Sequence, residues 1–346
     1  SAIILANLNM DVCKDINSNL ETTADISQGN NPAAISTFQV AAYSGPAMVT
    51  GFLSIPLVMV LPSLYVKNFG LSLTSIAAIL FFARMFDAIT DPIIGYLSDY
   101  TRARTGTRKP WVLVGALLFI ASSYYLYTPP ESADTLYLLC WVFLFYLSWT
   151  LFEIPHITWG GELAKDSVEK TKIYSIRYFF LKCGITLFYV IPLFPVFQSS
   201  GFTLETMRWS AICAVVLMVP LIYLNMRYVP SGHQYENASN NGQSLRKTLS
   251  SVIQNKPLLV FIGGYCFSGA AIGMWGGISY IFFDSYLSLG EKLPIIYTFG
   301  YVIGLLSIKV SFSLSVAYER RWVLVGGMVM VLLNAFFLGS IEPGPN

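Results

Sequence analysis

The chain has 346 residues and a formal net charge of +2, with 55% hydrophobic and only 12% charged residues. Soluble domains carry about 25% charged residues, so this composition excludes an ordinary soluble domain and favours an integral membrane protein. The balanced charge, without a basic tract, gives no sign of a nucleic-acid partner.

Residues 1–40 are mostly polar, as in "CKDINSNLETTADISQGNNP". The apolar start, "SAIILANL", lacks a basic flank and is too short for a signal peptide. We interpret this segment as a polar cytoplasmic tail without a regular fold.

The remainder predicts an all-α polytopic membrane protein. A spanning helix needs about 20 mostly apolar residues, and nine segments meet that criterion. They are residues 42–65, 74–98, 111–128, 136–160, 173–197, 209–228, 258–283, 294–316 and 322–341. The polar loop at 229–257 ends in the amphipathic stretch "LRKTLSSVIQNKP", which can lie along a membrane surface. The chain is therefore divided into six spans, a linker and three spans.

Lysine and arginine set the expected orientation, because short cytoplasmic loops carry an excess of both. In the loops after spans one, three, five and seven the only lysines and arginines are Lys67, Arg208 and Lys292. The loops after spans two, four, six and eight contain Arg102, Arg104, Arg108, Lys109, Lys165, Lys170, Lys172, Arg227, Arg246, Lys247, Lys256, Arg320 and Arg321. This asymmetry predicts a cytoplasmic N-terminus.

The second span carries Arg84, Asp87 and Asp91 near its middle. Each such charge costs about 2.5–3.5 kcal/mol at the centre of a bilayer. At about 100° per residue the three side chains fall within a wedge of about 60°, opposite an apolar face. We expect the charged face to look into the bundle interior or a water-filled cavity. Because one arginine cannot neutralise two aspartates, the carboxylates predict a site for Na⁺ or a proton, with a structural ion pair as the alternative.

The fourth span contains a third carboxylate, Glu153, within "WTLFEIPHITWGG". Pro155 frees a backbone carbonyl of this helix. Thr150, Glu153 and His156 fall near one face, and a carboxylate with a hydroxyl beside an interrupted helix is typical of ion sites at membrane depth. Thr150 and Glu153 are therefore candidate cation ligands. His156 and Trp159 are candidate solute contacts, with core packing as the alternative for both.

Other features are expected to be structural or to carry no chemistry. Arg177 lies in the first half of the fifth span, close enough to its cytoplasmic end for the guanidinium to reach the membrane interface. Lys182, deeper in the same span, is expected to pair with a carboxylate. The five cysteines form no CxxC and are expected to be buried packing residues. The glycine pairs at 160–161, 263–264, 276–277 and 326–327 are expected to mark close helix contacts. An enzyme is not expected, because the sequence has no paired metal-ligand histidines, GxSxG or nucleotide-binding glycine loop.

A longer motif covers the second and third spans. The stretch "FDAITDPIIGYLSDYTRARTGTRKPWVLVG", residues 86–115, combines Asp-x-x-x-Asp-Pro-x-x-Gly with a basic loop of the form Arg-x-Gly-x-x-[Lys/Arg]-Pro-Trp. It resembles the signature of the glycoside–pentoside–hexuronide:cation symporters, the melibiose permease family within the major facilitator superfamily. "WTLFEIPHITW" and "IRYFF" resemble parts of that family's fourth and fifth spans.

The resemblance implies a major-facilitator-type helix bundle that couples sugar uptake to the entry of Na⁺ or H⁺ by alternating access, without another cofactor. The positions that match the cation site are Asp87, Asp91, Thr150 and Glu153. The positions expected near the solute are Arg84 and Arg177, beside His156 and Trp159. The positions that match a cytoplasmic gating loop are Arg102, Arg104, Arg108 and Lys109.

Three departures from the family pattern affect these expectations. The tryptophan expected four residues after the acidic residue of the fourth span is Ile157 here, with Trp159 two positions on. The first span has no acidic residue where the family places a sugar-binding aspartate, and nine spans are present where the superfamily has twelve. The expected organisation is a tail (1–40), an N-terminal six-helix bundle (41–228), a cytoplasmic linker (229–257) and an incomplete C-terminal bundle of three spans (258–346).

The expected function is symport of a sugar, glycoside or similar small polar solute with a monovalent cation, by a monomer surrounded by membrane lipid. A lysophospholipid symporter of the same fold is one alternative. A non-transporting membrane sensor or scaffold is the alternative from another class.

Overall fold

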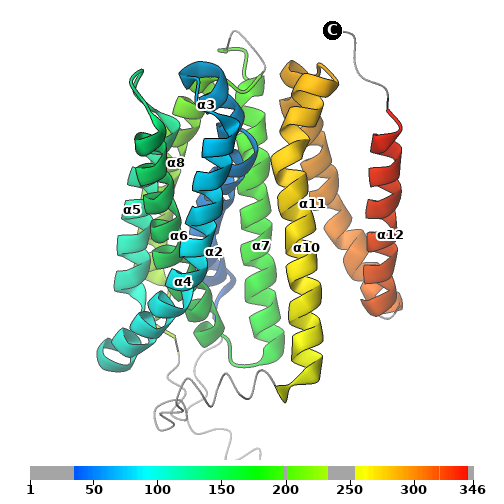
Figure 1. The fold of residues 1–346 in the computed structure, drawn as a ribbon. Coiled ribbons are helices and arrows are strands. Elements are labelled where there is room, and N and C mark those ends of the chain that lie inside the picture. The colour runs from blue at the N-terminus through cyan, green and yellow to red at the C-terminus, as the bar shows by residue number, and fades with distance from the viewer. Residues whose placement is uncertain (1–34, 198–200, 233–253, 319, 342–346) are drawn as a thin grey trace, which may run out of the picture. The chain divides into compact units, whose positions relative to one another are not determined.

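The computed structural model describes residues 35–197, 201–232, 254–318 and 320–341, and these contain helices and no strand. The described helices all belong to the unit Thr37–Asn346. Their bounds (Figure 1) are α2 Thr37–Met59, α3 Leu61–Phe69, α4 Leu73–Thr105, α5 Lys109–Tyr127, α6 Thr135–Leu163, α7 Ser167–Val190, η1 Ile191–Leu193, α8 Leu204–Tyr228, α10 Lys256–Ile281, the π-helix η3 Phe282–Tyr286, η4 Gly290–Lys292, α11 Leu293–Ala317 and α12 Arg320–Gly339.

Each predicted span coincides with helix. Seven helices in the described part of the chain are long and apolar enough to cross a membrane, and residues 325–339 of α12 form a shorter apolar helix. The prediction of an all-α polytopic fold is therefore confirmed. The predicted tail and the amphipathic part of the linker lie largely outside the described residues.

Several predicted bounds differ from those of the helices, and two of the differences have a clear cause in the sequence. The first span is divided into α2 and α3 around Val60, because Pro56 lies inside α2 and Pro62 lies at the start of α3. The second span runs on as helix to Thr105, seven residues beyond its predicted end. Gly106 ends it in a left-handed conformation, φ 76°, which glycine adopts without steric cost.

Close crossings hold the helices of the first six spans together. The most extensive contact joins α2 to α7, followed by α5 with α6. A Cβ on Gly184 of α7 would overlap the backbone carbonyl of Met48 on α2, and one on Gly115 of α5 would overlap the backbone of Phe152 on α6. Small residues thus let these backbones approach, as is typical between membrane helices.

The prediction that every glycine pair marks a close contact was only partly right. A Cβ on Gly160 would meet the Tyr43 side chain, which confirms that position. Gly263, Gly264 and the pair at 326–327 have no atom within 4 Å of a Cβ built there. These glycines face open space in the described structure, because the faces of α10 and α12 that carry them have no described neighbour.

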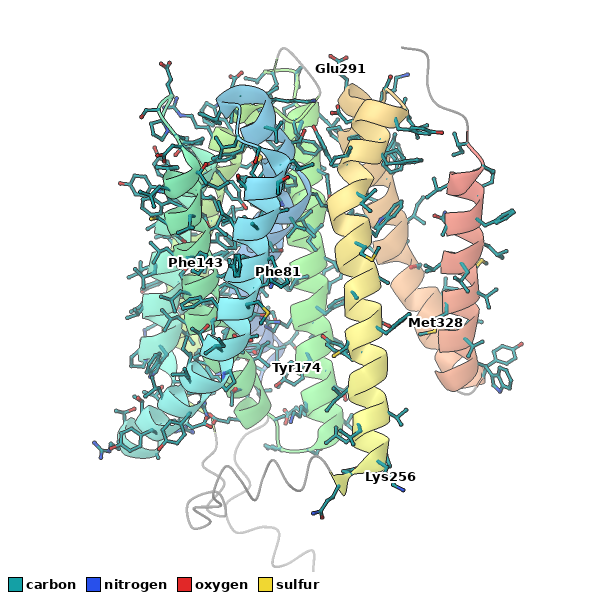
Figure 2. All side chains as sticks on the ribbon, viewed as in Figure 1. Phe81, Phe143, Tyr174, Lys256, Glu291 and Met328 are labelled. Atoms are coloured by element: carbon teal, nitrogen blue, oxygen red, sulfur yellow. The ribbon has the colours of Figure 1, made fainter. Side chains whose placement is uncertain are left out.

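Apolar side chains cover much of the outward surface, as expected for helices surrounded by lipid. Phe81 on α4 and Met328 on α12 are both exposed (Figure 2). The apolar face predicted for the second span is exposed at Phe82, Met85, Ile89 and Ile93. Lys256 is the first residue of α10, and Glu291 of η4 lies toward the opposite end of the bundle in Figure 2.

The cysteine prediction was wrong at two positions. Cys140 and Cys266 are exposed rather than buried, on the outer faces of α6 and α10, whereas Cys183 and Cys213 are partly buried. All four have free thiols, and Cys13 lies outside the described residues. An apolar run alone does not say which face of its helix meets lipid.

Two of the helices after the linker pack on the first six spans. α11 packs on α7, and α10 packs on α2. At one end of the bundle the Lys67 ammonium lies 2.7 Å from a carboxylate oxygen of Asp284, which joins the end of α3 to η3. Neither residue belonged to a recognisable sequence motif.

Candidate functional site

The charged face of α4, which carries Arg84, Asp87 and Asp91, contacts α6 near the middle of the bundle. Arg84 Nη1 lies 3.4 Å from Asp87 Oδ2, and the guanidinium also stands over the Tyr146 ring, 4.5 Å from its centroid. The Arg84 side chain is 59% exposed, whereas that of Asp87 is 13% exposed. Arg84 therefore lies at the rim rather than in the packed bundle interior, and its facing a water-filled cavity stays a prediction. The long Arg84–Asp87 contact is a weak ion pair.

Thr150 connects the two aspartates of α4 to α6. Its buried hydroxyl donates a hydrogen bond to Asp87 Oδ1 at 2.6 Å. Asp91, one turn along α4, interacts with both Asp87 and the Thr150 side chain. Among the described residues Asp91 makes no ion pair, so its negative charge has no direct cationic partner. Three of the four predicted cation ligands are thus brought together.

Glu153, the fourth predicted ligand, lies one turn of α6 beyond Thr150 and pairs with Arg177 of α7. Arg177 Nη2 donates to Glu153 Oε1 at 2.6 Å, and both side chains are largely buried. The second oxygen, Glu153 Oε2, is buried and has no hydrogen-bond partner among the described residues. Within that same part of the chain, no three His, Cys, Asp or Glu side chains converge as a metal site. Glu153 therefore stands apart from the two aspartates in this conformation.

His156 belongs to the core, where its hydrogen bonds determine its tautomer. Arg177 Nε donates to His156 Nδ1 at 3.4 Å, so that nitrogen carries a lone pair and the proton is on Nε2. Nε2 lies 3.1 Å from the carbonyl oxygen of Tyr43. The imidazole is stacked between the rings of Tyr43 and Phe152, with centroids 4.4 and 4.9 Å away. These contacts match the alternative of a hydrogen-bonded core histidine.

Trp159 is also fully buried in this conformation. Its indole nitrogen donates to the carbonyl oxygen of Pro230 at 2.8 Å, and its ring meets the edge of Tyr43. A solute could not stack on Trp159 or touch His156 unless this packing opened, because α2, α7, α8 and the segment after α8 pack against these two side chains of α6. Solute contact by these two residues therefore stays a prediction.

The charges of the site do not balance. Two arginines, Arg84 and Arg177, face the carboxylates of Asp87, Asp91 and Glu153, which leaves one negative charge when all are ionised. Carboxylate and hydroxyl oxygens are the donors that hard monovalent and divalent cations prefer. The arrangement can therefore hold one cation or one proton between α4 and α6.

The predicted gating loop is mostly helix. Arg102 lies in the last turn of α4, and Arg108 is the residue that precedes α5. Both arginines are buried and share the carboxylate of Glu162, near the end of α6, at 3.0 Å each. Arg102 also donates to the carbonyl oxygens of Gly106 and Gly232. The cluster of Arg102, Arg108 and Glu162 ties the ends of α4, α5 and α6 to the segment after α8.

The other two residues of that loop have different roles. Arg104 is exposed and lies over the Tyr100 ring, 4.2 Å from its centroid. Lys109 donates from Nζ to the carbonyl oxygen of Met226 at 2.8 Å. Glu162 and Asp99 were not among the predicted site residues, although Asp99 pairs with Arg108 at 2.7 Å. Both are carboxylates that closely precede a basic loop in the sequence, residues 102–109 for Asp99 and residues 165–172 for Glu162, and this position could have identified them.

Lys182 differs from its prediction. Among the described residues no carboxylate lies within ion-pair distance, so the expected pairing was wrong in this conformation. The ammonium instead lies 5.2 Å from the ring centroid of Tyr178 and 5.5 Å from that of Tyr301. The difference arises because Lys182 faces α11, whereas the buried carboxylates lie on α4 and α6.

The family match and the similar proteins all point to membrane transporters. Residues 42–342 match the family described as MFS/sugar transport protein. The chain is 28% identical over 194 residues to the inner membrane symporter YicJ of Escherichia coli, covering 55% of the chain and 42% of that relative. It is 27% identical over 208 residues to the putative glycoside/cation symporter YagG of Escherichia coli, covering 59% of the chain and 45% of the relative.

A third relative is the isoprimeverose transporter of Lactiplantibacillus pentosus, 22% identical over 204 residues, which covers 57% of the chain and 42% of that protein. The chain thus matches less than half the length of each of these relatives.

Proposed function

The chain belongs to the MFS/sugar transport family, among the glycoside–pentoside–hexuronide:cation symporters of the major facilitator superfamily, and from that premise we propose that it is a secondary active transporter. Its proposed activity is symport of a sugar or glycoside with a monovalent cation, Na⁺ or H⁺. The names of the relatives support a sugar and a coupling cation, and the family match covers residues 42–342.

The observation that carries this proposal is the charge of Asp91. A carboxylate near the centre of a spanning helix costs about 2.5–3.5 kcal/mol. Among the described residues Asp91 makes no ion pair, and Arg84 acts on it only at longer range. A membrane helix has little reason to keep such a charge unless an ion neutralises it. Asp87, Asp91 and the Thr150 hydroxyl would hold the cation, and the orphaned Glu153 Oε2 is a further oxygen available from the next turn of α6.

Coupling would follow from charge neutralisation. Without the cation, the site carries an excess negative charge, which disfavours closing the two halves of the bundle around it. Cation binding would remove that charge and favour solute binding nearby. The loaded protein would then move between inward- and outward-facing states, and a ligand shifts such an equilibrium only by its differential affinity for the two.

The topology forms part of the same proposal. Residues 41–228 would form the N-terminal six-helix bundle, 229–257 the cytoplasmic linker and 258–346 three spans of the C-terminal bundle. The N-terminus would be cytoplasmic, which the distribution of lysine and arginine supports. The Arg102–Arg108–Glu162 cluster would then lie on the cytoplasmic side and the Lys67–Asp284 pair on the outer side. The transporting unit would be the monomer.

The test is cation-dependent tryptophan fluorescence of the purified protein in lipid nanodiscs. Trp149 precedes Thr150 on α6 and is a built-in reporter of the site. The wild-type protein should show a saturable change when NaCl replaces choline chloride, or when the pH falls at constant Na⁺. Asp91→Asn should abolish that change, because it removes the negative charge and keeps the shape of the side chain.

The matched control is Glu131→Gln, which neutralises an exposed carboxylate in the turn between α5 and α6. It should respond as the wild type does. A full response in Asp91→Asn, or no response in the wild type to either cation, would contradict the proposed site.

A further inference from the structure

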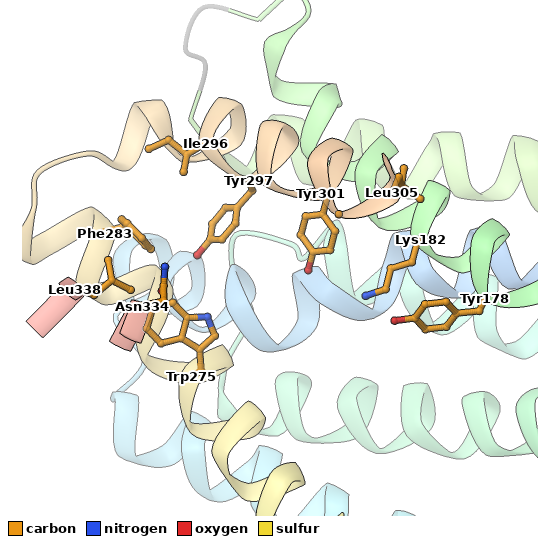
Figure 3. Close-up of a pocket in the computed structure, with 12 residues that line it drawn as sticks. Tyr178, Lys182, Trp275, Phe283, Ile296, Tyr297, Tyr301, Leu305, Asn334 and Leu338 are labelled. Carbon is orange, nitrogen blue, oxygen red and sulfur yellow. The ribbon is translucent and has the colours of Figure 1, made fainter. Parts of the chain in front are cut away.

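Two hollows lie on the outside of the first six spans, where α5 contacts α8. They share no lining residue with the cavity around Lys182, which faces α10, α11 and α12 (Figure 3). One is a cavity of about 680 Å³ formed by the end of α5 and the starts of α6 and α8. The other is a groove of about 420 Å³ between α5 and α8. Tyr124 lines both, so the cavity and the groove adjoin at its side chain.

The cavity and the groove differ in chemistry. Apart from Tyr124, the groove is lined by aliphatic side chains, those of Leu117, Ile120, Ala121, Ile212, Val215 and Val216. The cavity is lined by the carboxylate of Glu205, the guanidinium of Arg208 and several aromatic rings. A sugar carries hydroxyls on every side, and an aliphatic groove cannot bond to them. A ligand with a charged head and a hydrocarbon tail matches both hollows.

The position of the hollows along the helices matches the depth of such a ligand in a membrane. Tyr124 lies three residues before the last residue of α5, and Leu204, which lines the cavity, is the first residue of α8. Tyrosine and tryptophan at the ends of spanning helices mark the level of the lipid headgroups. From Tyr124 to Leu117 the groove follows α5 for about 10 Å, less than the roughly 15 Å of hydrocarbon in one leaflet. The cavity therefore lies at headgroup depth and the groove at the depth of the acyl chains.

Glu205 and Arg208 are placed to bind a headgroup that carries two opposite charges. They lie three residues apart on α8, so their side chains leave one face of the helix about 5–6 Å from each other. Both are exposed, and in the described ranges neither makes a hydrogen bond or an ion pair. Both charges are therefore available to a ligand in the cavity.

The aromatic wall of the cavity is held by contacts of its own. The rings of Tyr125 and Trp141 are stacked with their centroids 4.4 Å apart, and the Tyr137 hydroxyl donates to the carbonyl oxygen of Tyr125 at 2.6 Å. These contacts join α5 to α6, so the wall is formed before a ligand binds. Preformed aromatic faces favour a cationic group, because the face of a ring is electronegative.

We infer that the cavity and the groove together bind a phospholipid with an ethanolamine headgroup. Its phosphate lies against Arg208, whose planar guanidinium can donate two parallel hydrogen bonds to phosphate oxygens. Its ammonium donates to the Glu205 carboxylate beside the aromatic wall, and one acyl chain occupies the groove. A choline headgroup has no N–H to donate, so Glu205 favours ethanolamine over choline. The lipid belongs to the outer leaflet in the proposed topology, and the inference does not otherwise depend on symport.

The test is native mass spectrometry of the complete protein in detergent, titrated with phospholipids that have the same dioleoyl chains and different headgroups. The headgroups are ethanolamine, choline and glycerol. The wild type should bind its first ethanolamine lipid about fivefold more tightly than the glycerol lipid, as an exposed charge pair of about 1 kcal/mol gives. The choline lipid should bind more weakly than the ethanolamine lipid.

Three variants separate the parts of the site. Glu205→Gln should remove the preference for ethanolamine and leave the affinity for the glycerol lipid within about twofold. Arg208→Met should weaken the binding of all three lipids alike, because each carries the phosphate. Ala121→Trp should also weaken all three, because the indole would fill the groove.

Two control variants remove similar charges outside the cavity. Glu291→Gln neutralises an exposed carboxylate on η4, and Arg227→Met removes an exposed arginine at the other end of α8. Both should keep the wild-type preference for ethanolamine. These positions and those of the test variants at 205 and 208 are exposed, so the substitutions leave the packed core unchanged.

The inference is overturned if the wild type binds the three lipids equally or binds none of them, or if the preference for ethanolamine survives in Glu205→Gln. Binding of the choline lipid as tightly as the ethanolamine lipid would overturn the assignment of the headgroup. The cation site has a separate readout, the Asp91-dependent fluorescence response, so a failure of this inference is distinguishable from a failure of the proposed function.

Discussion

Replacing Glu162 by Gln tests whether burial determines the strength of the ion pairs in the Arg102–Arg108–Glu162 cluster. The Glu162 carboxylate lies 3.0 Å from both Arg102 and Arg108, whose side chains are 8% and 5% exposed. Removing one partner of a buried ion pair costs about 3–5 kcal/mol, because the other charge is left uncompensated. The remaining acceptors reduce that cost, since backbone carbonyls still bond to Arg102 and a second carboxylate still pairs with Arg108. We expect the free energy of unfolding to fall by about 2–3 kcal/mol.

Asp99→Asn is the matched control within the same cluster. Asp99 lies closer to Arg108, at 2.7 Å, but its side chain is 65% exposed. Because an exposed pair is screened by water, its loss should cost less than about 1 kcal/mol. Unfolding by sodium dodecyl sulfate in mixed micelles, followed by circular dichroism, would measure both variants. If Asp99→Asn destabilised the protein as much as Glu162→Gln, the reasoning from burial would be refuted.

Two further predictions follow from the packing. Gly184→Ala should lower the free energy of unfolding by about 1–3 kcal/mol, since its Cβ would overlap the Met48 carbonyl, whereas Gly263→Ala, with open space around it, should not destabilise the protein in the same titration. Cysteines introduced together at Lys67 and Asp284 should be joined by a short bifunctional thiol reagent, seen as a shift in gel mobility, because the native side chains meet at 2.7 Å. No link above the level of either single variant would place these helix ends apart in the membrane.

The positions of the helices could be predicted well from the sequence, and those of their ends less well. An apolar run of about 20 residues is a local signal, so every predicted span fell on helix. The end of α4 was placed too early, because its last turns carry Arg102 and Arg104 and read as a polar loop. Helix geometry there is set by hydrogen bonds up to the cap at Gly106, whatever the polarity of the side chains.

The candidate site was predicted in part. Helical periodicity places Arg84, Asp87 and Asp91 on one face, and the structure shows the two aspartates meeting Thr150. Helical periodicity could not predict that Glu153 pairs with Arg177, because the two residues belong to different helices. It also could not say that Lys182 would meet tyrosine rings rather than a carboxylate.

The sequence by itself determined that this protein is a bundle of apolar helices with a costly stripe of charge on its second span. Both conclusions depend on composition and on a period of 3.6 residues, which act within one helix. Only the tertiary structure decided which oxygen is left without a partner and which cation is left without an anion. Those outcomes depend on the axial offset between neighbouring helices. Close backbone contacts, such as that of Gly184 with Met48, set this offset, and they join residues that are far apart in the chain.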